Sequence, residues 1–537
     1  MRSFVWLVLG VLFGGSVVSW AGTMTPPKVI QADDENRYPS VASRQIQMVS
    51  SLAIAPEGRL WVTWYAGPTP HEDDNNYIVL ATSGDDGETW DEVFIVDPDG
   101  LGPVRAFDPE IWMDPHGRLW LFWAQAVKHG RQAHTWAMIL DHPDDEYAAW
   151  GEPFPVAPGV MMCKPIVLSS GEWLFPISDW EARMDRKPDE VSAGAWVSSD
   201  QGKSFALRGS ALVPVDVRTF DEHMVVERKD GSLWMLIRTR DGIRESVSTD
   251  RGHTWTDAAT SGIPHPAARF FIYRLESGNL LLVKHGSMEE RTGRSHLTAF
   301  ISKDDGATWE GGLLLDERGG ISYPDGQQAK DGTIYITYDY SRTRHRAIYV
   351  ATFTEADALA GEDVSGKVRL RMEVTNPGEQ TEDPSAPYTP AEFQLRDNRD
   401  GVALDRSSIA ILRPDHVDNV VDRLEVGKLI WHNRNYVFSV LPEELKGLSF
   451  FRTMIRQDSV RGVVEKDGMV YVLAHRAANT DQLRERGFVK TTIPDFIPYT
   501  VDGVYKPSDA FTVYQKHVKK GEVVEADQWG IPVFAVE

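Results

Sequence analysis

A glycine that opens a run of alternating apolar residues recurs six times in the first two thirds of this 537-residue chain. The copies begin at Gly58, Gly117, Gly171, Gly231, Gly278 and Gly332, at intervals of 59, 54, 60, 47 and 54 residues. Glycine suits the tight turn of a hairpin, and alternation is typical of its second strand. A hairpin unit with a long regular period predicts an all-β fold, a six-bladed β-propeller. A β-sandwich with accidental similarity between its hairpins is the alternative.

An octet of the form Ser-x-Asp-x-Gly-x-Thr-Trp follows four of these strands. The four octets are residues 83–90, 198–205, 248–255 and 302–309, and Phe205 replaces the closing tryptophan in the second. Residues 144–150 stand where a degenerate copy is expected. Serine and aspartate side chains can bond to nearby backbone amides, and glycine accepts a positive φ, so each octet predicts a tight turn.

The repeats divide the chain into four parts. Residues 1–21 have Arg2, an apolar stretch at 4–18 and the small residues Ser19 and Ala21, which indicates a signal peptide and a secreted or periplasmic protein. A membrane anchor is the alternative, but the apolar stretch is short and contains several glycines. The propeller is expected over residues 22–374. Residues 375–392 are polar and rich in proline, as in a linker, and alternation in 393–537 predicts a β-rich accessory domain.

Charge and cysteine content exclude several classes of function. The net charge is -23, from 56 basic and 79 acidic residues, which argues against nucleic acid and anionic membranes as partners. Cys163 is the single cysteine, so no intramolecular disulfide can form. No cysteine or histidine spacing indicates zinc, and neither a metal nor another cofactor is predicted. After the signal peptide no apolar run could span a membrane, and the oligomeric state is left open.

The octets on a six-fold repeat resemble the sialidase (neuraminidase) superfamily, over roughly residues 40–355. That resemblance implies a catalytic pair, Glu222 and Tyr323, with Tyr323 in a Ser-Tyr-x-Asp context. It also implies that Arg238 and Arg294 bind the substrate. The superfamily has a further arginine in the first inner strand, where this chain has Met48.

The resemblance places the catalytic acid in the acidic stretch 71–76, HEDDNN. Asp73 is the candidate, with Asp74 and Glu72 as neighbours that could replace it; a solvated turn or a calcium-binding loop is the other interpretation. The remaining candidates for substrate binding are Asp74 and three basic residues near comparable strand ends, namely Arg105, Lys164 and Arg269.

These residue types fit glycoside hydrolysis. A phenol is a weak nucleophile until a carboxylate accepts its proton, so Glu222 would serve as base for Tyr323. Asp73 would protonate the leaving oxygen and later activate water. The interpretation is an exported, exo-acting glycoside hydrolase for a terminal acidic sugar. The alternatives are a propeller glycosidase or lyase for another acidic polysaccharide, which Met48 favours, a non-catalytic carbohydrate-binding propeller, and a protein scaffold.

Overall fold

A computed structural model describes most of the chain. It covers residues 26–34, 37–100, 102–127, 131–180, 193–378, 395, 398–414, 420–426, 428, 430, 438, 440–452, 459–476, 478, 480–499, 509–527 and 529–535. The predicted signal peptide and residues 379–392 of the predicted linker lie outside these ranges.

Six antiparallel sheets form within the described part of residues 28–375. The first has the order β1 (Lys28–Gln31), β5 (Asp91–Asp97), β4 (Tyr77–Ser83), β3 (Leu60–Gly67), β2 (Ile46–Ile54). The second is β6 (Arg105–Met113), β7 (Leu119–Val127), β8 (Arg131–Leu140), β9 (Phe154–Pro158). The third is β10 (Val160–Met161), β12 (Trp173–Ser178), β13 (Ala193–Ser198), β14 (Ala206–Ala211), with β11 (Ile166–Val167) also paired to β12.

The other three sheets follow in chain order. The fourth is β15 (His223–Glu227), β16 (Leu233–Thr239), β17 (Gly242–Ser248), β18 (Ala259–Thr260). The fifth is β19 (Phe271–Arg274), β20 (Leu280–His285), β21 (Leu297–Ser302), β22 (Glu310–Asp316). The sixth is β23 (Ile321–Gln328), β24 (Thr333–Tyr340), β25 (Ala347–Thr354), β26 (Arg369–Thr375).

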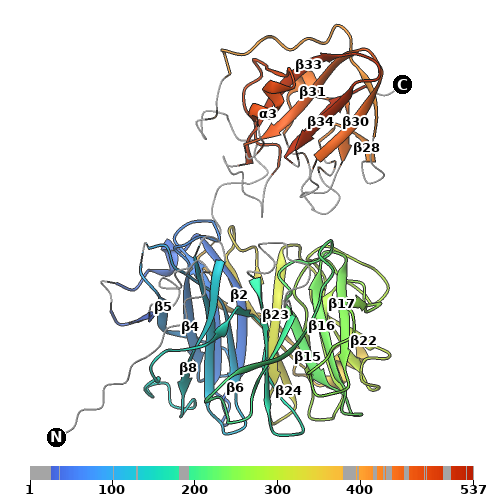
Figure 1. The fold of residues 1–537 in the computed structure, drawn as a ribbon. Coiled ribbons are helices and arrows are strands. Elements are labelled where there is room, and N and C mark those ends of the chain that lie inside the picture. Colours follow the sequence, from blue (N-terminus) through green and yellow to red (C-terminus); the bar gives the residue numbers. More distant parts are fainter. Residues whose placement is uncertain are drawn as a thin grey trace, which may run out of the picture.

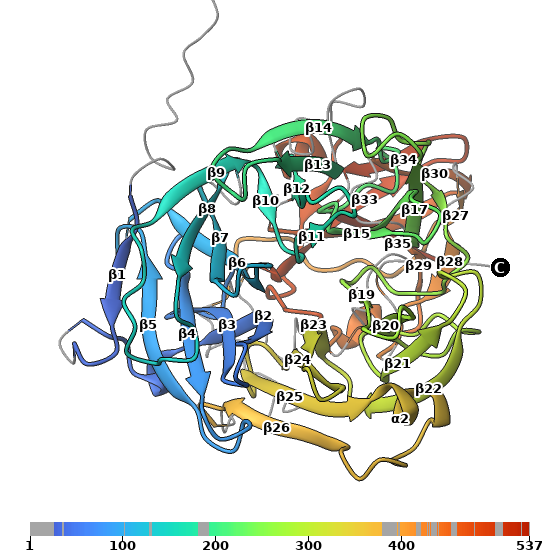
Figure 2. The ribbon, with the colours of Figure 1, turned by 90° about the horizontal axis from the view of Figure 1, so that it is seen from below.

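The sheets surround a common centre, as a propeller requires (Figure 2). Strand β2 contacts both β6 and β23, β6 contacts β10, β12 contacts β15, β15 contacts β19, and β19 contacts β23, which closes the ring. Neighbouring sheets pack face to face, so β2 is buried along its whole length, whereas all but one residue of the outer strand β26 are exposed or partly exposed. The all-β propeller prediction is confirmed.

Left-handed residues interrupt the inner strands at equivalent places. The pairing register shifts within β2, β6 and β23, and Val49, Asp108 and Tyr323 lie in those β-bulges with φ of 55°, 49° and 52°. Each stands nine residues before its hairpin glycine. A bulge redirects side chains and is common next to active sites.

The four octets form one repeated turn. In the first, Gly87 N donates to Ser83 Oγ at 3.0 Å, and Thr89 N donates to Asp85 Oδ1 at 2.9 Å. The other three turns repeat this pattern of serine and aspartate acceptors. Counted outward from the centre, each octet joins the third strand of a sheet to the fourth, and its aspartate is exposed or partly exposed to solvent.

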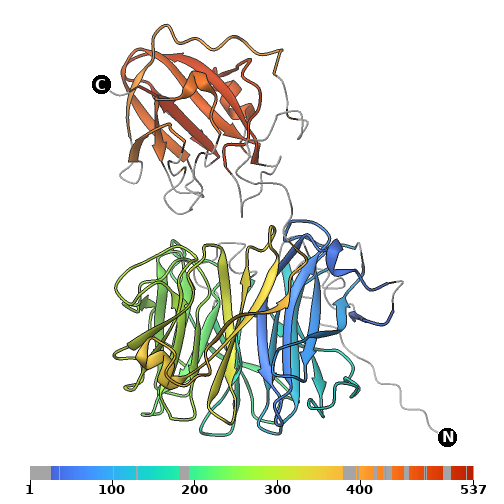
Figure 3. The ribbon, with the colours of Figure 1, turned by 180° about the vertical axis from the view of Figure 1, so that it is seen from behind.

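Two further sheets form after residue 393 (Figures 1 and 3). One is β27 (Ile411–Pro414), β30 (Ser459–Lys466), β34 (Val523–Asp527). The other is β28 (Val420–Arg423), β29 (Ser449–Arg452), β35 (Gly530–Phe534), β31 (Gly468–His475), β33 (Phe511–Val518), β32 (Val489–Lys490). The short helices are η1 (Val41–Ser43), α2 (Glu355–Ala360), η3 (Glu443–Leu445) and α3 (Thr480–Glu485). Among the described residues, no helix has the length and apolar character needed to cross a bilayer.

Candidate active site

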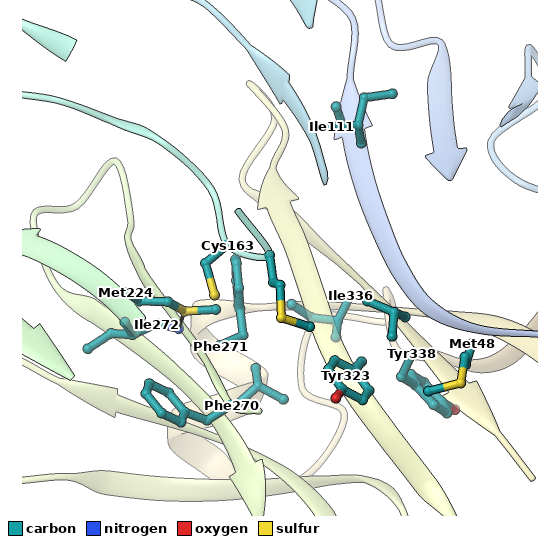
Figure 4. Packing of buried hydrophobic residues seen from close by; sticks show 14 of the residues in the cluster. Met48, Ile111, Cys163, Met224, Phe270, Phe271, Ile272, Tyr323, Ile336 and Tyr338 are labelled. Atoms are coloured by element: carbon teal, nitrogen blue, oxygen red, sulfur yellow. Dashed lines mark hydrogen bonds between the residues drawn. The ribbon is translucent and has the colours of Figure 1, made fainter. Parts of the chain in front are cut away.

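A buried phenol, a carboxylate and an arginine meet where the inner strands begin. Tyr323 Oη donates to Glu222 Oε1 at 3.1 Å and accepts from Arg238 Nη1 at 3.1 Å. Arg238 Nη1 also donates to Glu222 Oε1, and the two residues are joined again by the bond from Arg238 N to Glu222 O, 2.8 Å. All three side chains are at least 94% buried. Figure 4 shows Tyr323 among the apolar side chains at the centre of the ring.

Local folding brings these residues together. Glu222 directly precedes β15, and Arg238 lies near the end of β16, so the hairpin places them side by side. Tyr323 arrives from β23, two sheets further along the ring, and the bulge turns its side chain toward the pair. These positions lie at the strand ends opposite the octets.

Two more arginines surround the phenol. The guanidinium carbon of Arg294 lies 5.7 Å from the centre of the Tyr323 ring, and that of Arg342 lies 4.7 Å from it. Arg294 Nη1 donates to Ser322 Oγ at 2.6 Å, and Arg342 Nε contacts Asp339 Oδ1 at 3.5 Å. Sequence reasoning missed Arg342, which follows β24 of the last sheet.

The electrostatics keep the phenol protonated and the carboxylate charged. Burial, followed by the charge of Glu222, raises the pKa of Tyr323 to about 12, although the nearby arginines oppose this shift. Burial alone would raise the pKa of Glu222, but Arg238, Arg269 and Arg294 outweigh it and hold that pKa below its ordinary value. Burial and the charges of Arg342 and Arg238 lower the pKa of Arg294 to about 10. The cations therefore repel one another.

The loop between β3 and β4 holds the predicted acid. Asp73 Oδ1 accepts from Asn75 N at 2.9 Å, Asp73 Oδ2 accepts from Thr69 Oγ1, and Asp73 N donates to Asn76 Oδ1 at 3.1 Å. Asn76 Oδ1 also accepts from Arg105 Nε at 2.8 Å. The structure thus joins Asp73 to Arg105 through Asn76 and does not bring it into contact with Tyr323 or Glu222.

Glu72 and Asp74, which flank the predicted acid, have different neighbouring residues. Glu72 Oε2 lies 3.5 Å from Arg105 Nη2. The charge of Asp74 acts on Asp99, in the turn after β5, rather than on the phenol.

Asp108 is a second residue that sequence reasoning missed. Its side chain is 4% exposed, and no hydrogen bond to its carboxyl is formed by the described residues. Burial raises the pKa of Asp108 to about 8 against the opposing charge of Arg105, and the charges of Glu72 and Glu222 add to the rise. The spacing could have revealed it, because Asp108, Glu222 and Tyr323 each stand nine residues before a hairpin glycine.

Lys164 and Arg269, two predicted substrate ligands, lie in a buried ionic network below the phenol. Lys164 Nζ is 3.0 Å from Glu110 Oε1 and 2.8 Å from Asp325 Oδ2, and Arg269 is 3.8 Å from the second oxygen of each carboxylate. The Arg269 side chain is 1% exposed. Both residues are therefore engaged by protein groups, and the guanidinium carbon of Arg269 also lies 5.4 Å from the centre of the Tyr323 ring.

Comparisons with known proteins agree with this architecture. A family model described as a BNR repeat-like domain matches residues 58–336. A protein of Bacteroides fragilis (strain YCH46) named sialidase is 26% identical over 303 residues, which cover 49% of this chain and 54% of that protein. The chain thus spans about half the length of this relative.

Several solved structures are also similar. One is a protein of unknown function from Dyadobacter fermentans DSM 18053, with 18% identity, 59% of this chain and 93% of that chain covered, and a TM-score of 0.45. Another is the Hadza microbial sialidase Hz136, with 21% identity, coverage of 55% and 64%, and a TM-score of 0.45. A third is the intramolecular trans-sialidase from Ruminococcus gnavus, with 14% identity, coverage of 63% and 99%, and a TM-score of 0.48. Since one family model covers more than half of its residues, the chain belongs to the BNR repeat-like domain family, in agreement with the repeat fold that the octets predicted.

Proposed function

We propose that this protein is an exported, exo-acting glycoside hydrolase that removes a terminal acidic sugar from a glycan. The observation that carries the proposal is the hydroxyl of Tyr323, which bridges Glu222 and Arg238 in a buried place. Binding alone does not require a phenol with a carboxylate positioned to accept its proton, whereas nucleophilic catalysis does. Tyrosine is also the nucleophile that sialidases use.

In the proposed first step, Tyr323 Oη forms a bond to the anomeric carbon while the glycosidic bond breaks. Glu222 accepts the phenolic proton, and an acid donates a proton to the leaving oxygen. Water then attacks the same carbon and gives a proton to the carboxylate that acted as the acid. The bond to Tyr323 breaks at the same time, and Glu222 returns its proton to the phenolate oxygen. Asp73 remains the candidate acid, and Asp108 would donate a hydrogen bond to the sugar.

The charge around the phenol supports an acidic sugar. Arg238, Arg294 and Arg342 face one carboxylate, Glu222, with Asp339 behind Arg342. Guanidinium groups bind carboxylates through paired, charge-assisted hydrogen bonds, and an unpaired buried charge is costly. A carboxylate on the substrate would add a counter-charge beside these arginines that a neutral sugar cannot supply, so an acidic sugar fits better.

A substrate panel tests this proposal. We expect hydrolysis of an aryl sialoside, and no hydrolysis of neutral aryl glycosides, because only the acidic sugar offers a carboxylate to the arginines. An aryl uronoside is included because Met48 favours the other acidic sugars. Cleavage of the uronoside alone would give that second function, and cleavage of only neutral glycosides would overturn the argument from charge.

The catalytic pair is tested on the same substrate. Tyr323→Phe and Glu222→Gln should each reduce kcat by on the order of 10³-fold, and the double variant should lose little more, because the two groups act as one unit. Thermal unfolding of each variant serves as the control for folding. Losses that multiply in the double variant would contradict a shared step.

A further inference from the structure

Tyr323 has a backbone conformation that is unfavourable for any residue with a side chain. Its φ of 52° lies in the left-handed region, where a residue with a Cβ atom is strained, and it sits in the bulge of β23. Such a conformation persists only where its surroundings hold it. The carbonyl groups on either side of Tyr323 are each bound by a buried side chain.

Arg269 binds the carbonyl on one side. Arg269 Nη2 donates to Pro324 O, the next residue along the chain, at 3.1 Å, and its guanidinium carbon lies 5.4 Å from the centre of the Tyr323 ring. Arg269 also donates to Met162 O and, at 3.4 Å, to Ser50 O. One side chain therefore ties the inner parts of the first, third and sixth sheets together beneath the phenol.

His285 binds the carbonyl on the other side. Its Nε2 lies 3.0 Å from Ile321 O, two residues before Tyr323, so Nε2 carries the proton and donates. His285 Nδ1 then accepts from His265 Nε2 at 3.2 Å. Both rings are completely buried.

Arg269 already pairs with protein carboxylates and carbonyl groups. Its charge and that of Lys164 are balanced by Glu110 and Asp325, and its side chain is 1% exposed. Among the arginines around the phenol, Arg238 pairs with Glu222 and Arg342 with Asp339, whereas Arg294 donates to Ser322 Oγ and Ala267 O.

We propose that Arg269 and His285 are positioning residues, which clamp the carbonyls of Pro324 and Ile321 and thereby hold the hydroxyl of Tyr323 against Glu222. This inference rests on the proposed function only for its effect on turnover. The clamp itself concerns the geometry of Tyr323, which can be measured without a substrate.

The experiment uses two matched pairs of variants in the full chain. His285→Leu removes the donor, and His285→Gln keeps one at similar reach. Arg269→Met removes the guanidinium, and Arg269→Lys keeps only its charge. Arg274→Met is the control, because Arg274 lies in β19, close to Arg269 in the chain, and bonds Gly278 O and Glu227 O instead.

Steady-state kinetics provide the first measurement, on the aryl glycoside that the wild-type protein is found to cleave. We expect His285→Leu and Arg269→Met to reduce kcat by about 100-fold, the loss typical of a reacting group displaced by about 1 Å, with KM changed less than about threefold. His285→Gln should recover most of the rate, and Arg274→Met should resemble the wild type. Unchanged kcat, or a rise in KM with constant kcat, would overturn the clamp.

Crystal structures of the variants provide the second measurement and need no activity. In His285→Leu or Arg269→Met, Tyr323 should leave the left-handed region, and its contact with Glu222 should be lost. If Arg269→Met does not fold, Arg269→Lys and His285→Leu decide the matter. An unmoved Tyr323 refutes the clamp even where the wild type cleaves a glycoside. A wild type that cleaves none refutes only the proposed function.

Discussion

Asp108 is a carboxyl group that the fold keeps protonated. It is buried beside two other acidic residues, Glu72 and Glu222, and burial is the main reason that its pKa rises to about 8. An unfolded aspartate releases its proton near pH 4. Between these values the folded chain holds a proton that the unfolded chain has lost, so this residue makes the protein less stable as the pH rises from about 4 to about 8.

Asp108→Asn should remove that dependence, because asparagine resembles the protonated acid at every pH. At pH 8 we expect the variant to be more stable than the wild type by at least about 1 kcal/mol, and the difference should shrink toward pH 4. Urea unfolding of both proteins at several pH values measures it, with Glu289→Gln at an exposed position as the control. A stability difference that grows as the pH falls would show that Asp108 is ionised in the folded state.

Individual residues also show what the sequence could not settle. The resemblance to sialidases allowed the convergence of Glu222, Arg238, Arg294 and Tyr323 to be predicted, since it matches each of them to a site position near a strand end. Arg269 also stands at such a place, but its carboxylate partners come from other sheets, so its burial could not be foreseen. Arg342 was missed because it lies in the turn between β24 and β25, outside the strand motif on which the sequence reasoning relied.

The turn after β24 is the element that supplies Arg342. This turn is bound to the first sheet: Gln47 N donates to Arg342 O at 3.0 Å, Gln47 Nε2 donates to Arg346 O, and Arg346 Nη1 donates to Arg44 O. The sixth sheet thus places Arg342 next to β2, where Met48 stands in place of the arginine that the resemblance led us to expect. Such closing contacts between the first and last repeats cannot be deduced from a single hairpin motif.

Arg342→Met should therefore weaken binding of the acidic substrate. We expect KM to rise by about 10-fold to 100-fold with little change in kcat, as for the loss of a hydrogen bond between charged groups. Steady-state kinetics on the aryl sialoside measure this. Arg291→Met is the matched control, because Arg291 is exposed in the loop between β20 and β21 and bonds the backbone of Arg240 and Asp241. An unchanged KM would remove Arg342 from the anion site.

At the scale of the whole molecule, two sets of sheets have separate hydrophobic cores. The clusters of buried apolar residues within 26–378 contain no residue from the second set, and those within 395–535 contain none from the first, as far as the described residues go. The regular period of the hairpins predicted the first set of sheets, and the alternation of apolar residues along the chain predicted the second. The pairing order of the later sheets, in which β35 lies between β29 and β31, could not be predicted because no repeat imposes it.

Contacts at the end of the sixth sheet indicate where the chain can be truncated to remove the sheets that form after residue 393. Thr375 pairs with Ile348, and Gly378 O accepts from Arg346 Nη2 at 2.6 Å, so the chain up to residue 378 supports the turn that carries Arg342. We propose that residues 22–380 fold without the later sheets and keep kcat/KM on a small aryl substrate within about threefold, as expected of a domain with its own core.

Residues 22–374 make the matched comparison, because that truncation removes both Thr375 and Gly378. It should raise KM more than kcat falls, since Arg346 loses its carbonyl partner and the turn loosens. Circular dichroism and thermal unfolding of both truncations establish that they fold, and kinetics then separate the two effects. If residues 22–380 fold but lose activity as well, the later sheets supply part of the site, and the boundary that the proline-rich stretch indicated is misplaced.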